Sequence, residues 1–156
     1  MDLFLIRHAI AEERRAGLLD ANRQLTNKGR KRFEAMVKSL RRSSIRFDHV
    51  YHSPWLRAAQ TAELLAPITE GPLIATDELA ESPRAALFAS LDGDEVACVG
   101  HEPWMSEALS LLTTGDPHRL SVRFKKGAVA WLRGSPHPGA MQLRALWGTR
   151  SPHLTT

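Results

Sequence analysis

The chain has 156 residues, of which 43% are hydrophobic and 24% charged, and this length and composition suit one globular domain with a sizeable core. A single cysteine excludes an internal disulfide, and no apolar stretch approaches the roughly 18 residues needed to span a bilayer. The net charge of +4 favours anionic partners only weakly, because an ordinary solvated surface gives the same balance.

The first half of the chain alternates apolar runs with amphipathic stretches. Residues 3–6 are uniformly apolar, which predicts a strand that is buried on both faces of a sheet. Residues 26–43 predict a helix with Phe33 and Met36 on its apolar face and basic residues on the other. We interpret the basic face as solvated surface, with docking of an acidic phosphoprotein as the alternative. Three more elements are expected in this half, namely a strand at 47–52, a helix at 54–66 and a strand at 73–76.

The second half continues the same alternation. We expect a short helix at 83–91, a strand at 95–99, a helix at 103–114 and, joined by a turn-rich segment, two strands at 128–132 and 141–147. This order favours an α/β fold of three layers, α/β/α, with a mostly parallel central sheet and an antiparallel edge. Residues 1–150 are expected to form a single domain and residues 151–156 a frayed C-terminal tail.

Polar and charged residues follow three of the expected strands at the points where the strands end. The first strand runs into Arg7 and His8, the second into Ser53 and shortly afterwards Arg57, and the fourth into His101. Ligands of open α/β sheets bind outside the carboxyl ends of the strands, where parallel neighbours meet at one edge. The sequence therefore predicts that these five residues share one site.

The residue types at this edge favour a phosphate ligand. Guanidinium groups such as those of Arg7 and Arg57 match phosphate oxygens, and a helix that begins near Ser53 adds N–H donors at its N-terminus. We interpret Ser53 as the N-cap of that helix and a neighbour of the pocket, in preference to a nucleophile. Because two arginine charges disfavour an imidazolium, His8 is expected to be neutral and able to attack phosphorus, while His101 stabilises the transferred phosphoryl group. This chemistry needs no metal and no cofactor.

Other chemistries fit the sequence less well. Cys98 is not followed by the arginine, six positions on, of cysteine-based phosphatases, so we expect a buried strand residue. His49 and His52 lie three residues apart on a strand and should point to opposite faces, which argues against a shared metal ion. The basic clusters lack a zinc-finger, KH or RNP pattern, so nucleic acid is not expected as a partner. No signal-peptide pattern precedes the first strand, and we expect a soluble cytoplasmic protein without a membrane segment.

Three motifs, in this order, resemble those of the histidine phosphatase superfamily, which has the phosphoglycerate mutase-like fold. They are Leu5-Ile6-Arg7-His8, Ser53-Pro54-x-x-Arg57-Ala58-x-Gln60-Thr61-Ala62 and Val99-Gly100-His101-Glu102-Pro103. Within the superfamily, the short chain, the alanine after His8 and the Glu-Pro pair after His101 are similar to the small SixA-type phosphohistidine phosphatases.

The resemblance implies a metal-independent phosphatase in which His8 is the nucleophile and Arg7, Arg57 and His101 form the phosphate pocket. It also implies a substrate with phosphate on a protein histidine, as in a phosphotransfer domain of a signalling relay. Glu81 is the candidate proton donor, because it lies downstream of the second motif. Two alternatives stay open: a phosphomonoesterase for a small phosphate ester with Glu81 as general acid, and a phosphate-binding module without turnover.

Overall fold

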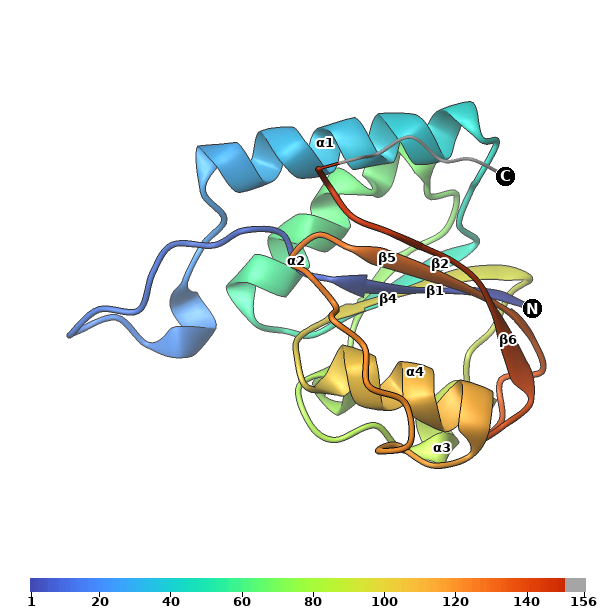
Figure 1. Cartoon of the computed structure of the whole chain (residues 1–156). Coiled ribbons are helices and arrows are strands. Elements are labelled where there is room, and N and C mark those ends of the chain that lie inside the picture. The colour runs from blue at the N-terminus through green and yellow to red at the C-terminus, as the bar shows by residue number, and fades with distance from the viewer. Residues whose placement is uncertain (151–156) are drawn as a thin grey trace.

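A six-stranded sheet forms the centre of the computed structural model, which describes residues 1–150. The strands are β1 (Asp2–Arg7), β2 (His49–His52), β3 (Leu73–Ala75), β4 (Glu95–Gly100), β5 (Val129–Gly134) and β6 (Met141–Trp147). They lie in the order β3-β2-β4-β1-β5-β6 (Figure 1). The first four strands are parallel, while β5 runs antiparallel to β1 and β6 antiparallel to β5. The predicted parallel sheet with an antiparallel edge is therefore confirmed.

Helices cover both faces of this sheet. The helices are α1 (Asn27–Arg42), α2 (Leu56–Leu64), α3 (Ala85–Ala89) and α4 (Trp104–Thr114), and the connections contain the short 3-10 helices η1 (Asp20–Asn22), η2 (Ala66–Ile68) and η3 (Asp77–Leu79). One face carries α1 and α2, and the other carries α3 and α4 (Figure 1). This is the three-layer α/β/α arrangement that the alternation of strands and helices predicts.

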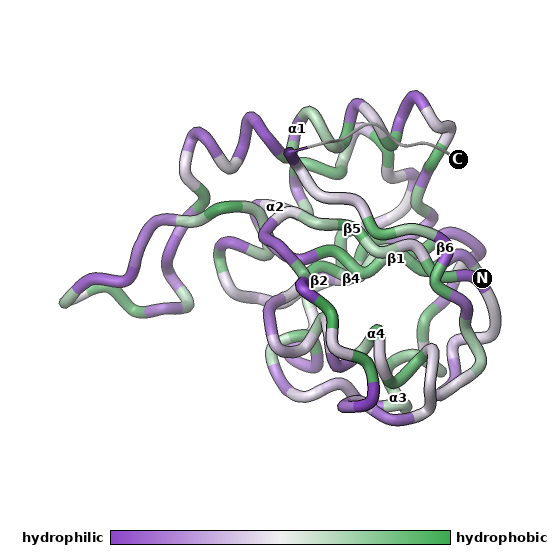
Figure 2. Tube along the Cα trace, viewed as in Figure 1, coloured by the Kyte–Doolittle hydropathy of each residue, from purple (hydrophilic) through white to green (hydrophobic). Residues whose placement is uncertain are grey.

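Residues 3–6 of strand β1 are all apolar because they lie between two hydrophobic cores. Phe4 and Ile6 pack with Phe33 of α1 in one core, whereas Leu3 and Leu5 contribute to the core beneath α4. All four β1 side chains are at most 1% exposed. Hydrophobic residues accordingly run along the central strands, while α1 alternates between hydrophobic and hydrophilic residues (Figure 2). Burial on both faces fixes the position of β1, and with it the residues that follow the strand.

The helix predicted at 54–66 is shorter in the structure, and the prediction that Ser53 is its N-cap is wrong. Helix α2 begins at Leu56, and its N-cap, Trp55, has no side-chain capping bond. Ser53 is fully buried, and its Oγ accepts a hydrogen bond from the Trp55 N–H at 3.3 Å in the turn before the helix. The Ser-Pro pair misled the prediction because proline suits both the first helical turn and the turn that precedes it.

The connection between β1 and α1 projects from the end of the sheet and carries η1 (Figure 1). The predicted tail at 151–156 lies outside the described residues. Within residues 1–150, no helix is both long and apolar enough to cross a membrane.

Candidate active site

The carboxyl ends of β1, β2 and β4 meet at one edge because the three strands are parallel neighbours. His8, which follows β1, donates its backbone N–H to the carbonyl of Gly100 at 2.9 Å. Ser53, which follows β2, donates its backbone N–H to the carbonyl of Val99 at 2.9 Å, and His101 directly follows β4. The structure therefore brings these residues together, with the ring centroids of His8 and His101 5.2 Å apart.

Two hydrogen bonds assign the tautomer of the His8 imidazole. Its Nδ1 lies 2.7 Å from the carbonyl oxygen of Ala9, and a carbonyl only accepts, so Nδ1 carries the proton. Its Nε2 receives the Nε–H of Arg57 at 3.3 Å and therefore bears the lone pair. This is the tautomer that a nucleophilic histidine requires, with the attacking nitrogen beside a phosphate-binding group.

Both histidines of the site are neutral at physiological pH. Burial lowers the pKa of His8 to about 3, against the hydrogen bond to the Ala9 carbonyl, which raises it, and the charges of His101, Arg57 and Arg7 also lower it. Burial also lowers the pKa of His101 to about 4, with the charge of Arg57 as the next cause. A neutral imidazole keeps its lone pair free, so low pKa values favour nucleophilic attack at Nε2 of His8.

Asp20 of η1 holds the Arg57 guanidinium in place, a contact that the sequence did not suggest. Arg57 is only 4% exposed, and its Nη1 donates to the Asp20 backbone carbonyl at 2.7 Å while its Nη2 lies 3.3 Å from the carboxylate. The guanidinium also lies over the Trp55 ring, 4.8 Å from the ring centroid. Asp20 and Arg57 are 37 residues apart and share no motif, so only the folded projecting connection reveals their pairing.

Two buried side-chain nitrogens of the site have no hydrogen-bond partner within residues 1–150, namely Nε of Arg7 and Nδ1 of His101. Nη1 of Arg7 donates a hydrogen bond to the backbone carbonyl of Phe124 at 2.7 Å. The Ser53 hydroxyl accepts the backbone N–H of Trp55 and lies 2.8 Å from Nε2 of His101, so this contact occupies Nε2 and leaves Nδ1 without a partner. The Nε–H of Arg7 is a buried donor without a partner, which is costly, and an anionic ligand would satisfy it.

Further hydrogen bonds fix the backbone around the nucleophile. The N–H of Gly127, a residue with a φ of 75°, donates to the carbonyl of His8 at 2.9 Å. On the other side, the Ala9 N–H donates to Oγ1 of Thr61 at 3.0 Å, and that hydroxyl donates to the Arg57 carbonyl at 2.7 Å. The second motif thus supports the first, because Thr61 joins the turn after β1 to the helix that carries Arg57.

The start of α1 packs directly on the chain that leaves the site. A Cβ atom at Gly29 would lie 2.1 Å from the backbone carbonyl oxygen of Ile10, which no side chain there tolerates. Gln60, also from the second motif, accepts the N–H of Leu25 on its Oε1 at 2.8 Å. Close backbone contact and these bonds leave the His8 turn little freedom to move.

Glu81 lies near the site but not among its hydrogen bonds. It lines a hollow of about 290 Å³ together with His101, Glu102 and other residues that follow η3 and β4. Its carboxylate pairs with Arg84 at 3.0 Å, and both side chains are largely exposed. The Glu102 carboxylate is bonded to the backbone and hydroxyl of Ser106.

Cys98 and His49, which the sequence does not assign to the site, lie elsewhere in the structure. Cys98 is fully buried in β4, as predicted, and burial raises the pKa of its thiol to about 12. His49 uses Nδ1 for a contact of 3.0 Å with the Asp92 carbonyl, away from the site. Within the described part of the chain, no group of three or more His, Cys, Asp or Glu side chains is arranged to hold a metal ion.

The fold matches solved structures over nearly its whole length. The protein histidine phosphatase SixA, solved in complex with tungstate, is 23% identical, with a TM-score of 0.81 over 97% of this chain and 99% of that one. A phosphoserine phosphatase of Entamoeba histolytica, in complex with 3-phosphoglyceric acid, is 18% identical, with a TM-score of 0.70 over 98% and 99% of the two chains. These likenesses establish a phosphoglycerate mutase-like α/β fold.

Sequence comparisons identify the family. An uncharacterized protein of Picosynechococcus sp. is 32% identical over 155 residues, which cover 93% of this chain and 90% of the relative. The family model of the histidine phosphatase superfamily (branch 1) matches residues 3–85, a range that contains two of the three motifs with Arg7, His8 and Arg57. With this match and the fold in agreement, the chain belongs to the histidine phosphatase superfamily.

Proposed function

We propose that this protein is a metal-independent phosphatase that removes phosphate from phosphohistidine on a protein, with His8 as the nucleophile. The observation that carries the proposal is the state of His8, which is neutral, protonated on Nδ1 and turned with Nε2 toward Arg57. Nε of Arg7 and Nδ1 of His101, which have no hydrogen-bond partner within residues 1–150, are available for contacts with the phosphate. The SixA structure is that of a protein histidine phosphatase, which supports the same substrate class.

The first step transfers the phosphoryl group to His8. A phosphate bound by Arg7, Arg57 and His101 replaces the Arg57 hydrogen bond on Nε2, and Nε2 then attacks phosphorus. The P–N bond of the substrate breaks, its electron pair stays on the departing imidazole, and that imidazole leaves neutral when its other nitrogen already carries a proton. His8 keeps its Nδ1 proton, so its phosphorylated ring is positively charged and is stabilised by the Ala9 carbonyl at 2.7 Å.

The second step releases inorganic phosphate. A water molecule attacks phosphorus, the bond from phosphorus to Nε2 breaks, and its electron pair returns to Nε2. The proton of the water goes to the phosphate or to solvent. The positive charge on the phosphorylated His8 ring makes it a good leaving group, so the chain needs no additional acid in this step.

The environment of Glu81 supports phosphohistidine over a phosphate ester. An alkoxide leaving group needs a proton from a general acid, whereas an imidazole does not. Glu81 is exposed, and its carboxylate pairs with Arg84 instead of joining the hydrogen bonds around His8 and His101. A phosphate ester is the second candidate substrate, because Glu81 shares a hollow with His101 and the phosphoserine phosphatase has the same fold.

A comparison of substrates tests the proposal. The wild-type protein is assayed, with and without a metal chelator, on a histidine-phosphorylated phosphotransfer domain, on phosphoserine and on several phosphosugars. We expect kcat/KM for the phosphorylated domain to exceed kcat/KM for every ester by about a hundredfold or more, because hydrolysis of an ester lacks a general acid in this site. The chelator should not change either value. A preference for an ester, lost in Glu81→Gln, would instead assign the second candidate function.

A further inference from the structure

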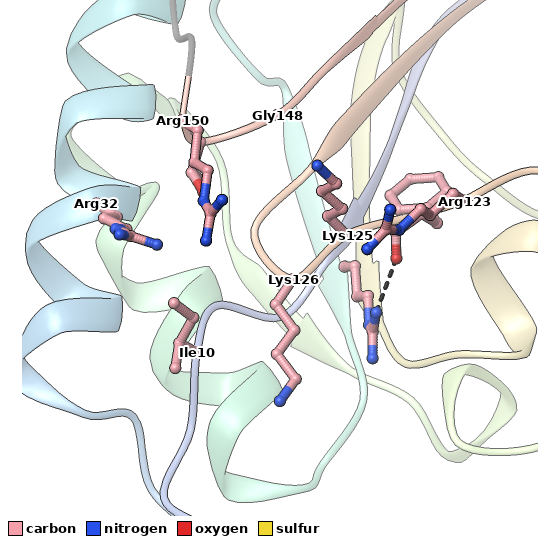
Figure 3. Close-up of a pocket in the computed structure, with 10 residues that line it drawn as sticks. Ile10, Arg32, Arg123, Lys125, Lys126, Gly148 and Arg150 are labelled. Atoms are coloured by element: carbon pink, nitrogen blue, oxygen red, sulfur yellow. Dashed lines mark hydrogen bonds between the residues drawn. The ribbon is translucent and has the colours of Figure 1, made fainter.

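A large basic hollow adjoins the active site on the side of Arg7. Its volume is about 530 Å³, and no acidic residue lines it. Besides Arg7, its cationic side chains come from three separate segments, namely Arg32 of α1, Arg123, Lys125 and Lys126 before β5, and Arg150 after β6 (Figure 3). Arg7 also belongs to the candidate phosphate site, so the basic hollow and that site share this residue.

Within the part of the chain that the structure describes, no acidic side chain forms an ion pair with the cations of the basic hollow. By contrast, Arg14, Arg15 and Arg23 nearby in the projecting connection all have acidic partners. Burial lowers the pKa of Lys126, and the charges of Arg7, Arg23 and Arg57 lower it further, while the charge of Glu13 raises it by less than any of these lowers it. Uncompensated cations beside one another favour binding of an anionic partner.

The arrangement of the charges points to a broad partner. Lys125 and Lys126 point apart, while Arg32 and Arg150 extend into the hollow from α1 and from the segment after β6 (Figure 3). Most of these side chains are exposed and long, and they surround an open hollow. A compact second phosphate would contact few of them. A protein surface with several separated carboxylates would contact them all while its phosphohistidine occupies the adjacent site.

We propose that the basic hollow docks an acidic face of the phosphohistidine-bearing substrate protein, next to its phosphorylated histidine. This inference rests on the proposed function and deepens it, because it specifies the surface chemistry of the partner. Long, exposed cations speed the association of an acidic partner and orient it on the surface. Docking therefore lowers KM for the protein substrate. Free phosphohistidine has the same P–N bond but no protein surface, so the basic hollow contributes nothing to its turnover.

Charge reversal in the basic hollow tests the inference. The probes are an acidic phosphotransfer domain phosphorylated on histidine, the same domain with the Asp and Glu residues around that histidine changed to Asn and Gln, and free phosphohistidine. The test variant is Arg32→Glu/Lys125→Glu, which spares the catalytic site. The control, Lys38→Glu/Arg41→Glu, makes the same change in net charge on the far part of α1, where Lys38 and Arg41 line another hollow. Melting temperatures establish that both variants fold.

We expect the test variant to raise KM for the acidic domain about tenfold at low ionic strength, and the control variant to raise it less than about twofold. Neutralising the domain should abolish the difference, and free phosphohistidine should be hydrolysed alike by all three proteins. Equal effects of test and control variants on the acidic domain, or an equal loss with free phosphohistidine, would overturn the docking proposal alone. Failure of the wild-type protein to hydrolyse phosphohistidine in any form would overturn the proposed function, and the docking proposal with it.

Discussion

Acidification should leave His8 neutral far below the pH at which an ordinary histidine becomes protonated. With a pKa of about 3, as burial imposes on His8, an imidazole is about 99% neutral at pH 5. At an unperturbed pKa near 6.5, only about 3% is neutral at that pH. The neutral fraction that is available for attack therefore differs about thirtyfold between the two cases.

Nitrogen NMR of the ligand-free protein, titrated from pH 8 to pH 4.5, measures this difference directly. We expect the His8 ring to remain a neutral Nδ1–H tautomer throughout, and the same chain unfolded in urea to titrate near pH 6.5. Titration of His8 between pH 6 and 7 in the folded protein, or an Nε2–H tautomer, would refute the reasoning from burial and from the Ala9 contact.

The same pKa shift makes a prediction about stability. Because the pKa of His8 is lower in the folded than in the unfolded chain, the unfolded chain binds more protons below pH 6.5, and folding stability is lost as the pH falls toward about 3. One fully shifted histidine contributes a slope of about 1.4 kcal/mol per pH unit in that window. The slope of the unfolding free energy, measured in urea between pH 6 and 4.5, should therefore be smaller by about this amount in His8→Gln.

Three substitutions test the supports of the site. Gly29→Ala places Cβ 2.1 Å from a backbone oxygen and should lower the free energy of unfolding by about 2–4 kcal/mol in urea titrations, and an unchanged value would contradict the close contact. Asp20→Asn removes the charge that holds Arg57 and should lower kcat/KM about tenfold with little change in melting temperature; a large loss of stability instead would mark Asp20 as mainly structural. Ser53→Ala deprives His101 of its partner at 2.8 Å and should lower kcat about tenfold more than it changes KM, whereas a change in KM alone would argue against a role in the transition state.

The sequence was most informative where local pattern and topology coincide. An apolar run that ends in Arg7 and His8 predicts a strand buried on both faces, and the alternation of elements predicts parallel neighbours, so the shared edge follows from both. The position of Ser53 was misread because a Ser-Pro pair fits either a helix start or the turn before it. Asp20 pairs with Arg57 because the connection between β1 and α1 folds back toward the site. The pattern of polar and apolar residues in the sequence does not indicate how that connection folds.

The basic hollow was unpredictable for a related reason. Its cations come from α1, from the segment before β5 and from the segment after β6, which are far apart in the sequence. From the sequence, the basic residues of α1 are interpreted as a solvated face, with docking of an acidic phosphoprotein as the alternative, and nothing there links them to residues 123–126 or to Arg150. Only the antiparallel return of β5 and β6 beside β1 brings the three segments together around Arg7.

The covalent intermediate on His8 is the most direct test of the mechanism. The protein is mixed with a histidine-phosphorylated phosphotransfer domain, quenched within milliseconds in alkali, which preserves phosphohistidine, and digested for mass spectrometry. Phosphate should appear on His8 in the wild-type protein, and His8→Ala should carry none and should lose about a thousandfold or more in kcat, as expected when a nucleophile is removed. Phosphate on another residue, or turnover by His8→Ala near the wild-type rate, would contradict nucleophilic attack by His8.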